Sequence, residues 1–263
     1  MTADGLAREG RVVTALGRRA LSVQFRRAQL LMPTFVLPLM LLAVIASGTS
    51  AAQGLDAFPT VGSYLGFVVP GTVVQGALLC GLTSGTALAG DIEGGFFDRL
   101  LAAPVHRTSL VLGRLVGTVG LALVQATFFL LVALLFGATY PGGPLAVLAA
   151  ILLAALTAAG IGGIASAIAL RTGSLSLMQS IFPFVFILLF TAPAFFPRDL
   201  LSPALRDVSA FNPLTYVVEG IRALLTGDGA LGDPWLGLLA AVVLAVVTTG
   251  LATLALKDRI RTA

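Results

Sequence analysis

Residues 115–170 read LVGTVGLALVQATFFLLVALLFGATYPGGPLAVLAAILLAALTAAGIGGIASAIAL, and none of these 56 residues is Asp, Glu, Lys or Arg. A helix needs ~20 apolar residues to cross a bilayer core about 30 Å thick, so this stretch is long enough to cross twice. The turn Pro141-Gly142-Gly143-Pro144 interrupts it, and such a cluster ends one helix and begins the next. We therefore predict a helical hairpin.

Four further stretches also lack charged residues, namely 28–55, 57–90, 172–197 and 234–256. A charge at the centre of a span costs ~2.5–3.5 kcal/mol on insertion scales, so uncharged stretches of this length indicate membrane spans. The chain is 57% hydrophobic and 11% charged, whereas soluble domains have about 25% charged residues. We predict an all-α integral membrane protein, a single domain over 1–263. Its six predicted transmembrane helices are 28–48, 65–88, 113–137, 145–170, 174–196 and 235–256.

The basic residues indicate the orientation. With six spans, the side that holds both termini has 13 Arg and Lys residues and the opposite side has three. Because Arg-rich loops stay in the cytoplasm, we predict cytoplasmic N and C termini. The apolar run at 28–48 exceeds the 7–15 residues of a cleaved signal core, so it is expected to remain as a span. Fifteen Arg against one Lys is typical of a GC-rich bacterial genome, which suggests a multi-pass protein of the bacterial inner (plasma) membrane.

The N-terminal segment 1–27 is expected to form a basic amphipathic helix over 11–27. Its apolar residues recur at helical spacing, with Arg11, Arg18, Arg19, Arg26 and Arg27 between them. Such a helix lies along the inner membrane face with Arg at anionic headgroups. It serves either as an anchor alone or also as a contact for a cytoplasmic partner, and the sequence does not separate the two.

A predicted helix over 90–107 occupies the loop between the second and third spans. Its apolar residues fall on one helical face at Ile92, Phe96, Leu100 and Ala103, and Pro104 ends the element. A helix with an aromatic side and a charged side suits docking into a groove on a soluble partner. The alternative is a loop helix that tucks Phe96 and its neighbour Phe97 under its own bundle.

The outer segment 198–233 carries two helix starts. Ser202-Pro203 and Asn212-Pro213 each place a capping residue before a proline at the first helical position. The second helix shows one apolar stripe, ends at Gly227 and is too short to span a membrane. Glu219 and Arg222 lie on its other face. The two helices either dip in from the outside and are buried against protein, or lie on the outer leaflet. Phe195 and Phe196 either cap a cavity from outside or sit at the interface.

The sequence lacks the residues needed for nucleotide binding, ion-coupled transport, catalysis or metal binding. The sequence has no Gly-x4-Gly-Lys-Ser/Thr phosphate loop, and its one lysine, Lys257, follows the last span. The predicted spans carry no charge apart from Arg114, which argues against ion-coupled transport. Cys80 is expected to be a buried hydrophobe and His106 a solvated loop residue. We expect no enzyme activity, no cofactor and no metal site in this chain, so uphill movement would take its energy from another chain.

Over essentially its whole length the chain resembles a known family, the membrane subunits of type-2 ABC exporters, and within it the daunorubicin-resistance-like drug export permeases. The resemblance rests on the six predicted spans with an N-terminal interfacial helix and on two segments. The segment from Asp91 to Arg107 is similar to the family's acidic-then-Leu-Leu-x-x-Pro coupling segment. Phe211-Asn212-Pro213-Leu214-Thr215-Tyr216, followed by Glu219, Gly220 and Arg222, resembles its outer re-entrant element. Gly94-Gly95-Phe96-Phe97 departs from the family, which more often has a Thr-Leu type step there.

The resemblance implies a separate nucleotide-binding subunit that holds ATP and Mg and docks at the coupling helix. It also implies a second permease copy, as a homodimer or a heterodimer, and an amphipathic small-molecule substrate, with no role for nucleic acid. Lipid-linked polysaccharide export and a non-transporting membrane scaffold remain as alternatives. The residues expected to couple to the ATPase are Asp91, Glu93, Phe96, Phe97, Arg99 and Pro104. Those expected to form the outer gate are Phe195, Phe196, Asn212, Pro213, Tyr216 and Glu219.

Overall fold

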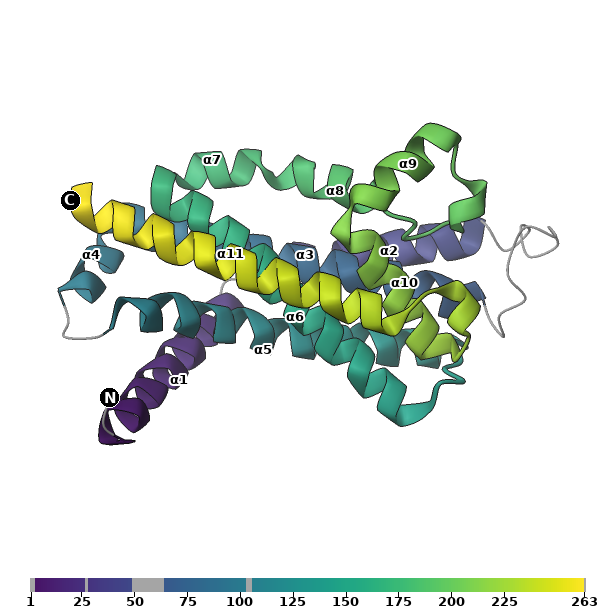
Figure 1. The fold of residues 1–263 in the computed structure, drawn as a ribbon, viewed down its shortest axis with the longest axis horizontal. Helices are drawn as coiled ribbons and strands as arrows, with labels where there is room; N and C mark the ends of the chain where they lie inside the picture. Colours follow the sequence, from purple (N-terminus) through teal and green to yellow (C-terminus); the bar gives the residue numbers. More distant parts are fainter. Residues whose placement is uncertain (1–2, 27, 49–63, 103–105, 263) are drawn as a thin grey trace.

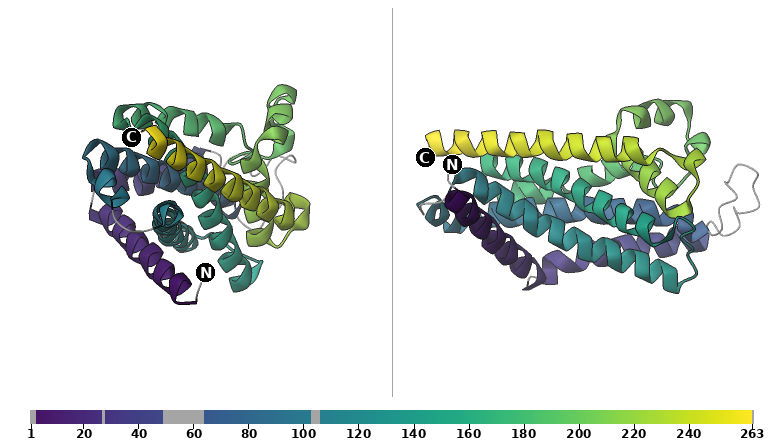
Figure 2. Two further views of the ribbon diagram at one scale, coloured as in Figure 1. Left: turned by 60° about the vertical axis from the view of Figure 1, so that its left-hand side comes forward. Right: turned by 60° about the horizontal axis from the view of Figure 1, so that its bottom comes forward.

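The computed structural model describes residues 3–26, 28–48, 64–102 and 106–262, and every regular element in these ranges is helical. The helices form an elongated bundle (Figure 1). Both termini and α4 lie at one end, while α9, α10 and the turn between α5 and α6 lie at the other (Figures 1 and 2). The elements are α1 (Ala3–Arg26), α2 (Ala28–Gly48), α3 (Tyr64–Glu93), α4 (Phe96–Leu101), α5 (Arg107–Leu135), α6 (Gly143–Thr172), α7 (Leu175–Ser180), α8 (Phe182–Phe190), η2 (Arg198–Leu200), α9 (Pro203–Phe211), α10 (Pro213–Thr226), η3 (Gly229–Leu231) and α11 (Pro234–Thr262).

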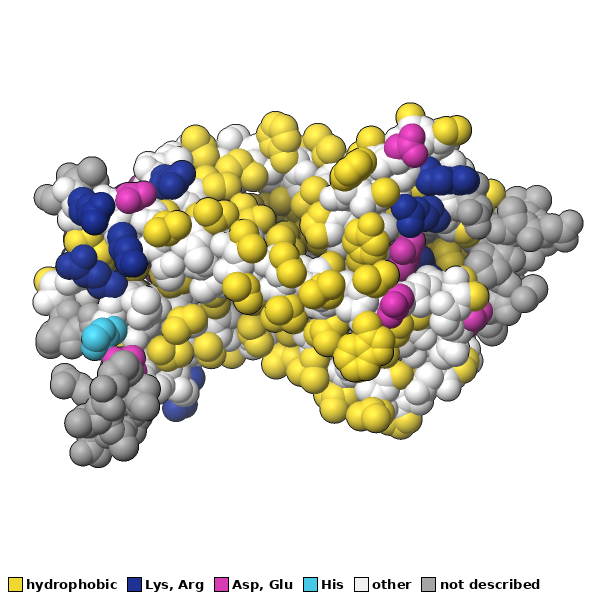
Figure 3. All heavy atoms as spheres, in the orientation of Figure 1, with side chains coloured by type: hydrophobic (Ala, Val, Ile, Leu, Met, Phe, Trp, Pro, Cys, Tyr) yellow, Lys and Arg dark blue, Asp and Glu magenta, His cyan; other side chains and the backbone are white. Residues whose placement is uncertain are grey.

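Four helices, α3, α5, α6 and α11, are long and apolar enough to cross a membrane, and they correspond to four of the six predicted spans. In α3, 94% of the apolar window is buried, against 22% in α11, so α3 is the centre of the bundle and α11 presents most of its surface outward. Hydrophobic side chains cover the middle of the molecule and charged side chains gather at its two ends (Figure 3). This distribution is that of a multi-pass membrane protein.

The other two predicted spans are less regular. The helix α2 has the predicted bounds and follows α1 across a bend of 67°, and the two together meet the length and hydropathy expected of a span. The predicted helix over 174–196 is instead two short helices, α7 and α8, that meet at Ile181. Pro183 lies in the first turn of α8 and has no N–H to continue the hydrogen-bond ladder from α7.

Small residues let the central helices approach closely. A methyl group added at Gly81 would lie 2.7 Å from the backbone nitrogen of Gly162, and one at Gly85 would lie 2.5 Å from Cβ of Ala165. Both contacts are between α3 and α6. In a bilayer, where apolar burial alone does not drive helix association, such close packing is a main source of attraction.

The predicted hairpin is confirmed, because α5 ends at Leu135 and α6 begins at Gly143 with Pro144 in its first turn. The predicted starts and end of the outer helices are also confirmed. Ser202 caps α9, Asn212 caps α10, and α10 ends at Gly227, whose φ of 72° suits glycine. The N–H of Gly142 donates to the carbonyl of Leu225 at 3.2 Å, which joins α10 to the hairpin turn.

Candidate functional site

A buried ion pair joins α3 to α5 at the end of the molecule that holds both termini. Nη2 of Arg114 lies 2.6 Å from Oδ2 of Asp91, and the two side chains are only 12% and 10% exposed. The guanidinium also donates to the carbonyl of Ser84 at 3.4 Å. Removing one partner of such a pair leaves an uncompensated buried charge, at a cost of about 3–5 kcal/mol in the interior. The pair therefore fixes the end of α3 against the beginning of α5.

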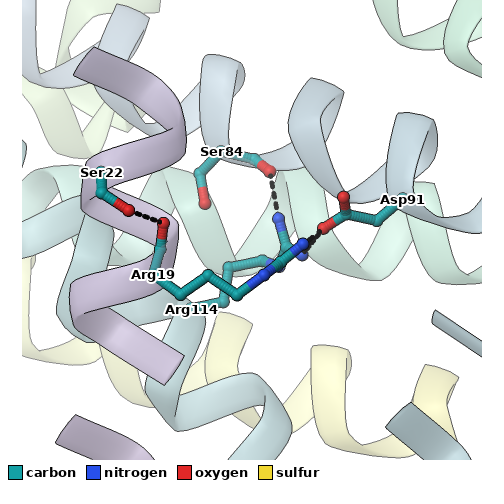
Figure 4. A network of polar contacts seen from close by, with 5 residues as sticks. All are labelled: Arg19, Ser22, Ser84, Asp91 and Arg114. Atoms are coloured by element: carbon teal, nitrogen blue, oxygen red, sulfur yellow. Dashed lines mark hydrogen bonds and ion pairs between the residues drawn. The ribbon is translucent and has the colours of Figure 1, made fainter. Parts of the chain in front are cut away.

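A third charge reaches the same carboxylate from α1. Nη1 of Arg19 lies 3.7 Å from Oδ2 of Asp91, and Figure 4 shows Arg19 and Arg114 converging on Asp91 from different helices. The guanidinium carbon of Arg19 also lies 3.7 Å from the ring centroid of Phe96 in α4. Four helices, α1, α3, α4 and α5, thus meet around one acidic side chain, and we call Asp91, Arg114, Arg19 and Phe96 the junction.

Glycines in α1 and α5 place Arg19 within reach of the junction. An added methyl at Gly113 would lie 2.6 Å from Cβ of Leu16, and one at Gly117 would lie 2.7 Å from Cβ of Ala20. Residues of the two helices alternate along this contact, so the backbone of α1 lies directly on α5 (Figure 1). A larger side chain at either glycine would push α1 away and withdraw Arg19 from Asp91.

The predicted helix over 90–107 is wrong in its bounds. The helix α3 continues to Glu93, a turn follows at Gly94-Gly95, and α4 is only the six residues from Phe96 to Leu101. Gly95 has φ 67°, a left-handed conformation that ends α3 and that a side chain would oppose. The turn redirects the chain, so the apolar positions before and after it do not share one helical face.

The predicted coupling residues have different surroundings. Asp91 is part of the buried pair, and Phe97 is 4% exposed within a cluster that includes Met178 of α7. Glu93 is exposed and accepts a hydrogen bond at 2.7 Å from the N–H of Leu175, the first residue of α7. Arg99 is exposed at the tip of α4, whereas Pro104 lies outside the described residues. The ring of Phe97 is therefore buried in the bundle, while Asp98 and Arg99 leave a charged, exposed surface on α4.

The sequence analysis did not predict the two partners of Asp91, and it did not predict the acidic partner of His106. Arg114 was recognised as the charge at the start of an uncharged stretch, and that position was the available signal. His106 is exposed, as predicted, but its Nε2 lies 3.0 Å from Oε1 of Glu9, which is an acidic neighbour contributed by α1.

At the opposite end, Arg222 of α10 is 3% exposed, so the face opposite the apolar stripe, predicted to carry Arg222 and Glu219, is buried at Arg222. Its guanidinium donates to the carbonyls of Phe67, Pro193 and Ala194 at 3.2, 2.9 and 3.1 Å, and its central carbon lies 4.1 Å from the Phe67 ring centroid. Burial lowers its pKa to about 10, so it stays protonated at neutral pH. A buried cation therefore clamps the segment after α8 between α3 and α10.

Asn212 joins three helices. Its side-chain oxygen accepts from the N–H of Leu214 at 2.9 Å and so caps α10, while Nδ2 donates to the carbonyl of Leu188 at 2.7 Å and to Oγ1 of Thr191 at 3.0 Å. The hydroxyl of Tyr216 donates to the carbonyl of Ala210 in α9 at 2.8 Å. One amide thus connects the end of α8 to the α9–α10 corner.

The remaining predicted gate residues divide by exposure. Phe195 is 2% exposed within the core and Phe196 is 45% exposed, so the two neighbours have separate surroundings. Pro213 is the first residue of α10. Glu219 is half-buried; burial raises its pKa, and the charges of Arg198 and Arg222 oppose that rise. These residues line one corner of the fold, whose rigid centre is Arg222 and Asn212.

An apolar cavity of about 190 Å³ lies between these two ends, where α7 and α8 pass α3 and α6. Its walls include Leu78, Ile161, Met178 and Phe184, and every residue that lines it is hydrophobic. Within the described ranges, no three His, Cys, Asp or Glu side chains lie close enough together to hold a metal. The cavity can therefore hold an apolar group, and no polar side chain lines it to form hydrogen bonds with a bound molecule.

Comparison with known proteins gives a consistent set of similarities. Residues 11–226 match the model of the ABC-2 type transporter family. The chain is 30% identical over 212 residues to the putative transport permease ycf38 of Porphyra purpurea, covering 80% of this chain and 72% of that protein. It is 26% identical over 185 residues to the daunorubicin resistance ABC transporter permease protein DrrB1 of Streptomyces coeruleorubidus, covering 70% of this chain and 65% of that protein.

Proposed function

This chain belongs to the ABC-2 type transporter family, and on that basis we propose that it is the permease subunit of an ATP-driven exporter of hydrophobic drugs or secondary metabolites. A separate nucleotide-binding subunit, which holds ATP and Mg, supplies the energy. The similarity to a daunorubicin resistance permease and the wholly apolar cavity support a hydrophobic or amphipathic substrate.

The junction is the observation that carries this proposal. Helix α4 projects at the end of the bundle with exposed Asp98 and Arg99, a surface that a soluble subunit can grip. The first residue of α4, Phe96, contacts the guanidinium of Arg19. Arg19 and Arg114 both form ion pairs with the carboxylate of Asp91. A displacement of α4 by the nucleotide-binding subunit is then passed to α1, α3 and α5 together.

The membrane arrangement that goes with this function has six spans and cytoplasmic termini in a bacterial inner membrane. In it α2 is the first span, α1 lies along the inner face beyond the 67° bend, and α7 with α8 forms a broken fifth span. Helices α9 and α10 form the outer re-entrant segment, with Arg222 and Asn212 holding it in place. Two permease copies and two nucleotide-binding subunits make the working unit.

Transport in inside-out vesicles tests the proposal. The chain is produced with and without a nucleotide-binding subunit of the ATP-binding cassette type, and ATP-dependent uptake of a fluorescent amphipathic drug is measured. We expect uptake only when both subunits and ATP are present. Uptake or drug resistance that persists at full level without the ATPase would contradict the proposal, because this chain would then not depend on a partner for its energy.

A further inference from the structure

A basic pocket of about 350 Å³ lies between the beginning of α5 and the end of α11. Three of its six lining residues are cations and two are hydroxyl-bearing, and none is acidic. Figure 3 shows basic side chains gathered at this end of the molecule. The lining residues are Arg107, Thr108, Thr253, Leu256, Lys257 and Arg261.

The positive charge of the pocket is not balanced by nearby acids. Asp258 follows Lys257 directly, but its carboxylate lies 3.8 Å from Arg171 on another helix. Glu9, the acid near the start of α5, is 3.0 Å from His106. Within the ranges that the structure describes, none of the three pocket cations forms an ion pair. The pocket therefore offers a concentrated positive charge to an anion from outside the chain.

The first turn of α5 adds further anion-binding groups. Arg107 and Thr108 are its first two residues, and the side chain of His106 before them makes no capping hydrogen bond. The N–H groups in the first turn of a helix have no intrahelical acceptors, and the helix dipole favours a negative charge there. The N–H of Ser109 already donates to the carbonyl of His106 at 3.0 Å, so the cations and hydroxyls of the pocket, with the first two N–H groups of α5, are the groups that suit the oxygens of a phosphate.

Exposed apolar positions on α5 and α11 form a path along the outside of the bundle, away from this pocket. On α5, Leu112 follows Thr108 by one turn and is exposed. On α11, Gly250 lies two turns before Lys257 on the same face, and a methyl group added there would meet no atom within 4 Å. Val246, one turn further, is also exposed. A soluble anion would make no favourable contact with this apolar surface, whereas the acyl chain of a lipid would pack against it.

We propose that this pocket binds the phosphate headgroup of an anionic phospholipid, whose acyl chains lie against the exposed apolar positions of α5 and α11. Basic pockets between membrane helices on the cytoplasmic side recognise anionic headgroups in this way. An acidic surface of a protein partner would satisfy the same cations, but the apolar path favours a lipid. A bound lipid would hold the start of α5, which follows the α4 loop, against the end of α11.

Native mass spectrometry of the full-length chain in mild detergent tests the proposal, with dioleoyl phosphatidylglycerol and dioleoyl phosphatidylcholine as probes. Phosphatidylglycerol is expected to bind at least about tenfold more tightly. Each basic residue contributes about fivefold near an anionic headgroup, so K257Q/R261Q should lower phosphatidylglycerol affinity by about 25-fold. The control R99Q removes an exposed charge on α4 at the same end, outside the pocket, and should change the affinity less than about twofold.

Three results would overturn the proposal. The first is equal phosphatidylglycerol binding by the wild type and K257Q/R261Q, or an equal loss in R99Q, which would indicate a general attraction. The second is inorganic phosphate displacing the lipid headgroup at similar affinity, which would assign the pocket to a free anion. The third is loss of assembly with the nucleotide-binding subunit in K257Q/R261Q with lipid binding unchanged, which would assign the pocket to a protein partner. None of these depends on transport activity.

Discussion

Neutralising the two central residues of the junction, singly and together, tests whether Asp91 and Arg114 act as one unit. Asp91→Asn removes the charge that Arg114 and Arg19 share, and Arg114 is then left 12% exposed with no counter-ion. We expect a loss of about 4 kcal/mol in unfolding free energy. Arg114→Gln is milder, because Arg19 remains 3.7 Å from Asp91. Its expected loss is about 2 kcal/mol, typical of one strong hydrogen bond to a charge.

The double variant separates pair coupling from the individual effects. With Asn and Gln in place, no charge remains unpaired between these two positions, and two amides can still form a hydrogen bond. The double variant should therefore lose about 2 kcal/mol less than the two single losses taken together. Unfolding of the full-length chain in detergent micelles, followed by far-ultraviolet circular dichroism during denaturant titration, provides all four free energies.

A surface pair in the same protein serves as the matched control. Arg171 and Asp258 lie 3.8 Å apart with side chains 66% and 60% exposed, so Arg171→Gln and Asp258→Asn should couple by less than about 1 kcal/mol. Losses at Asp91 and Arg114 that add within about 0.5 kcal/mol would refute the idea that the buried pair is a unit. A coupling no larger than that of the surface pair would refute it equally.

Three further predictions concern packing and the outer corner. Gly117→Leu in α5 should destabilise the chain by about 1–3 kcal/mol, because its Cβ would lie 2.7 Å from that of Ala20 in α1. Gly10→Leu, in open space on α1, is the control, and an equal loss there in thermal denaturation would disprove the packing explanation. Arg222→Gln should cost about 3 kcal/mol or more by leaving buried carbonyls without a donor, and an unchanged denaturation midpoint would contradict its role as a clamp. Asn212→Ala should cost about 2 kcal/mol through the lost cap and amide bonds, and Asn212→Asp should recover only part of it, since a carboxylate keeps the cap but cannot donate.

The uncharged stretches predicted the spanning helices because a bilayer excludes charge whatever the tertiary structure. They did not show that the fifth stretch would break at Ile181, since the residues on both sides of the break are uncharged and most of them are apolar. Pro183 was a signal for a break, yet a proline in a membrane helix can be accommodated without one. Gly94-Gly95 was a stronger signal, and the apolar spacing on both sides of it favoured one continuous helix that the structure does not have.

The partners of the two buried arginines were beyond sequence reasoning for different reasons. Arg222 donates to backbone carbonyls of Phe67, Pro193 and Ala194. Every residue has such a carbonyl, so the residue types in the sequence cannot indicate which ones accept these bonds. Arg114 and Asp91 are 23 positions apart on two helices, so their meeting depends on the register of α3 against α5. Close packing at glycines sets the register of α1 on α5, and through it the approach of Arg19 to Asp91.

The most direct test of the account is the accessibility of α4. The one native cysteine, Cys80, is buried and can be replaced by alanine, and Arg99→Cys then places a single thiol at the exposed tip of α4. We predict that a membrane-impermeant maleimide labels this thiol in inside-out vesicles and not in intact cells, and that the nucleotide-binding subunit protects it. Labelling from the outside of intact cells, or labelling at the same rate with and without that subunit, would contradict the claim that α4 receives the movement of a cytoplasmic ATPase.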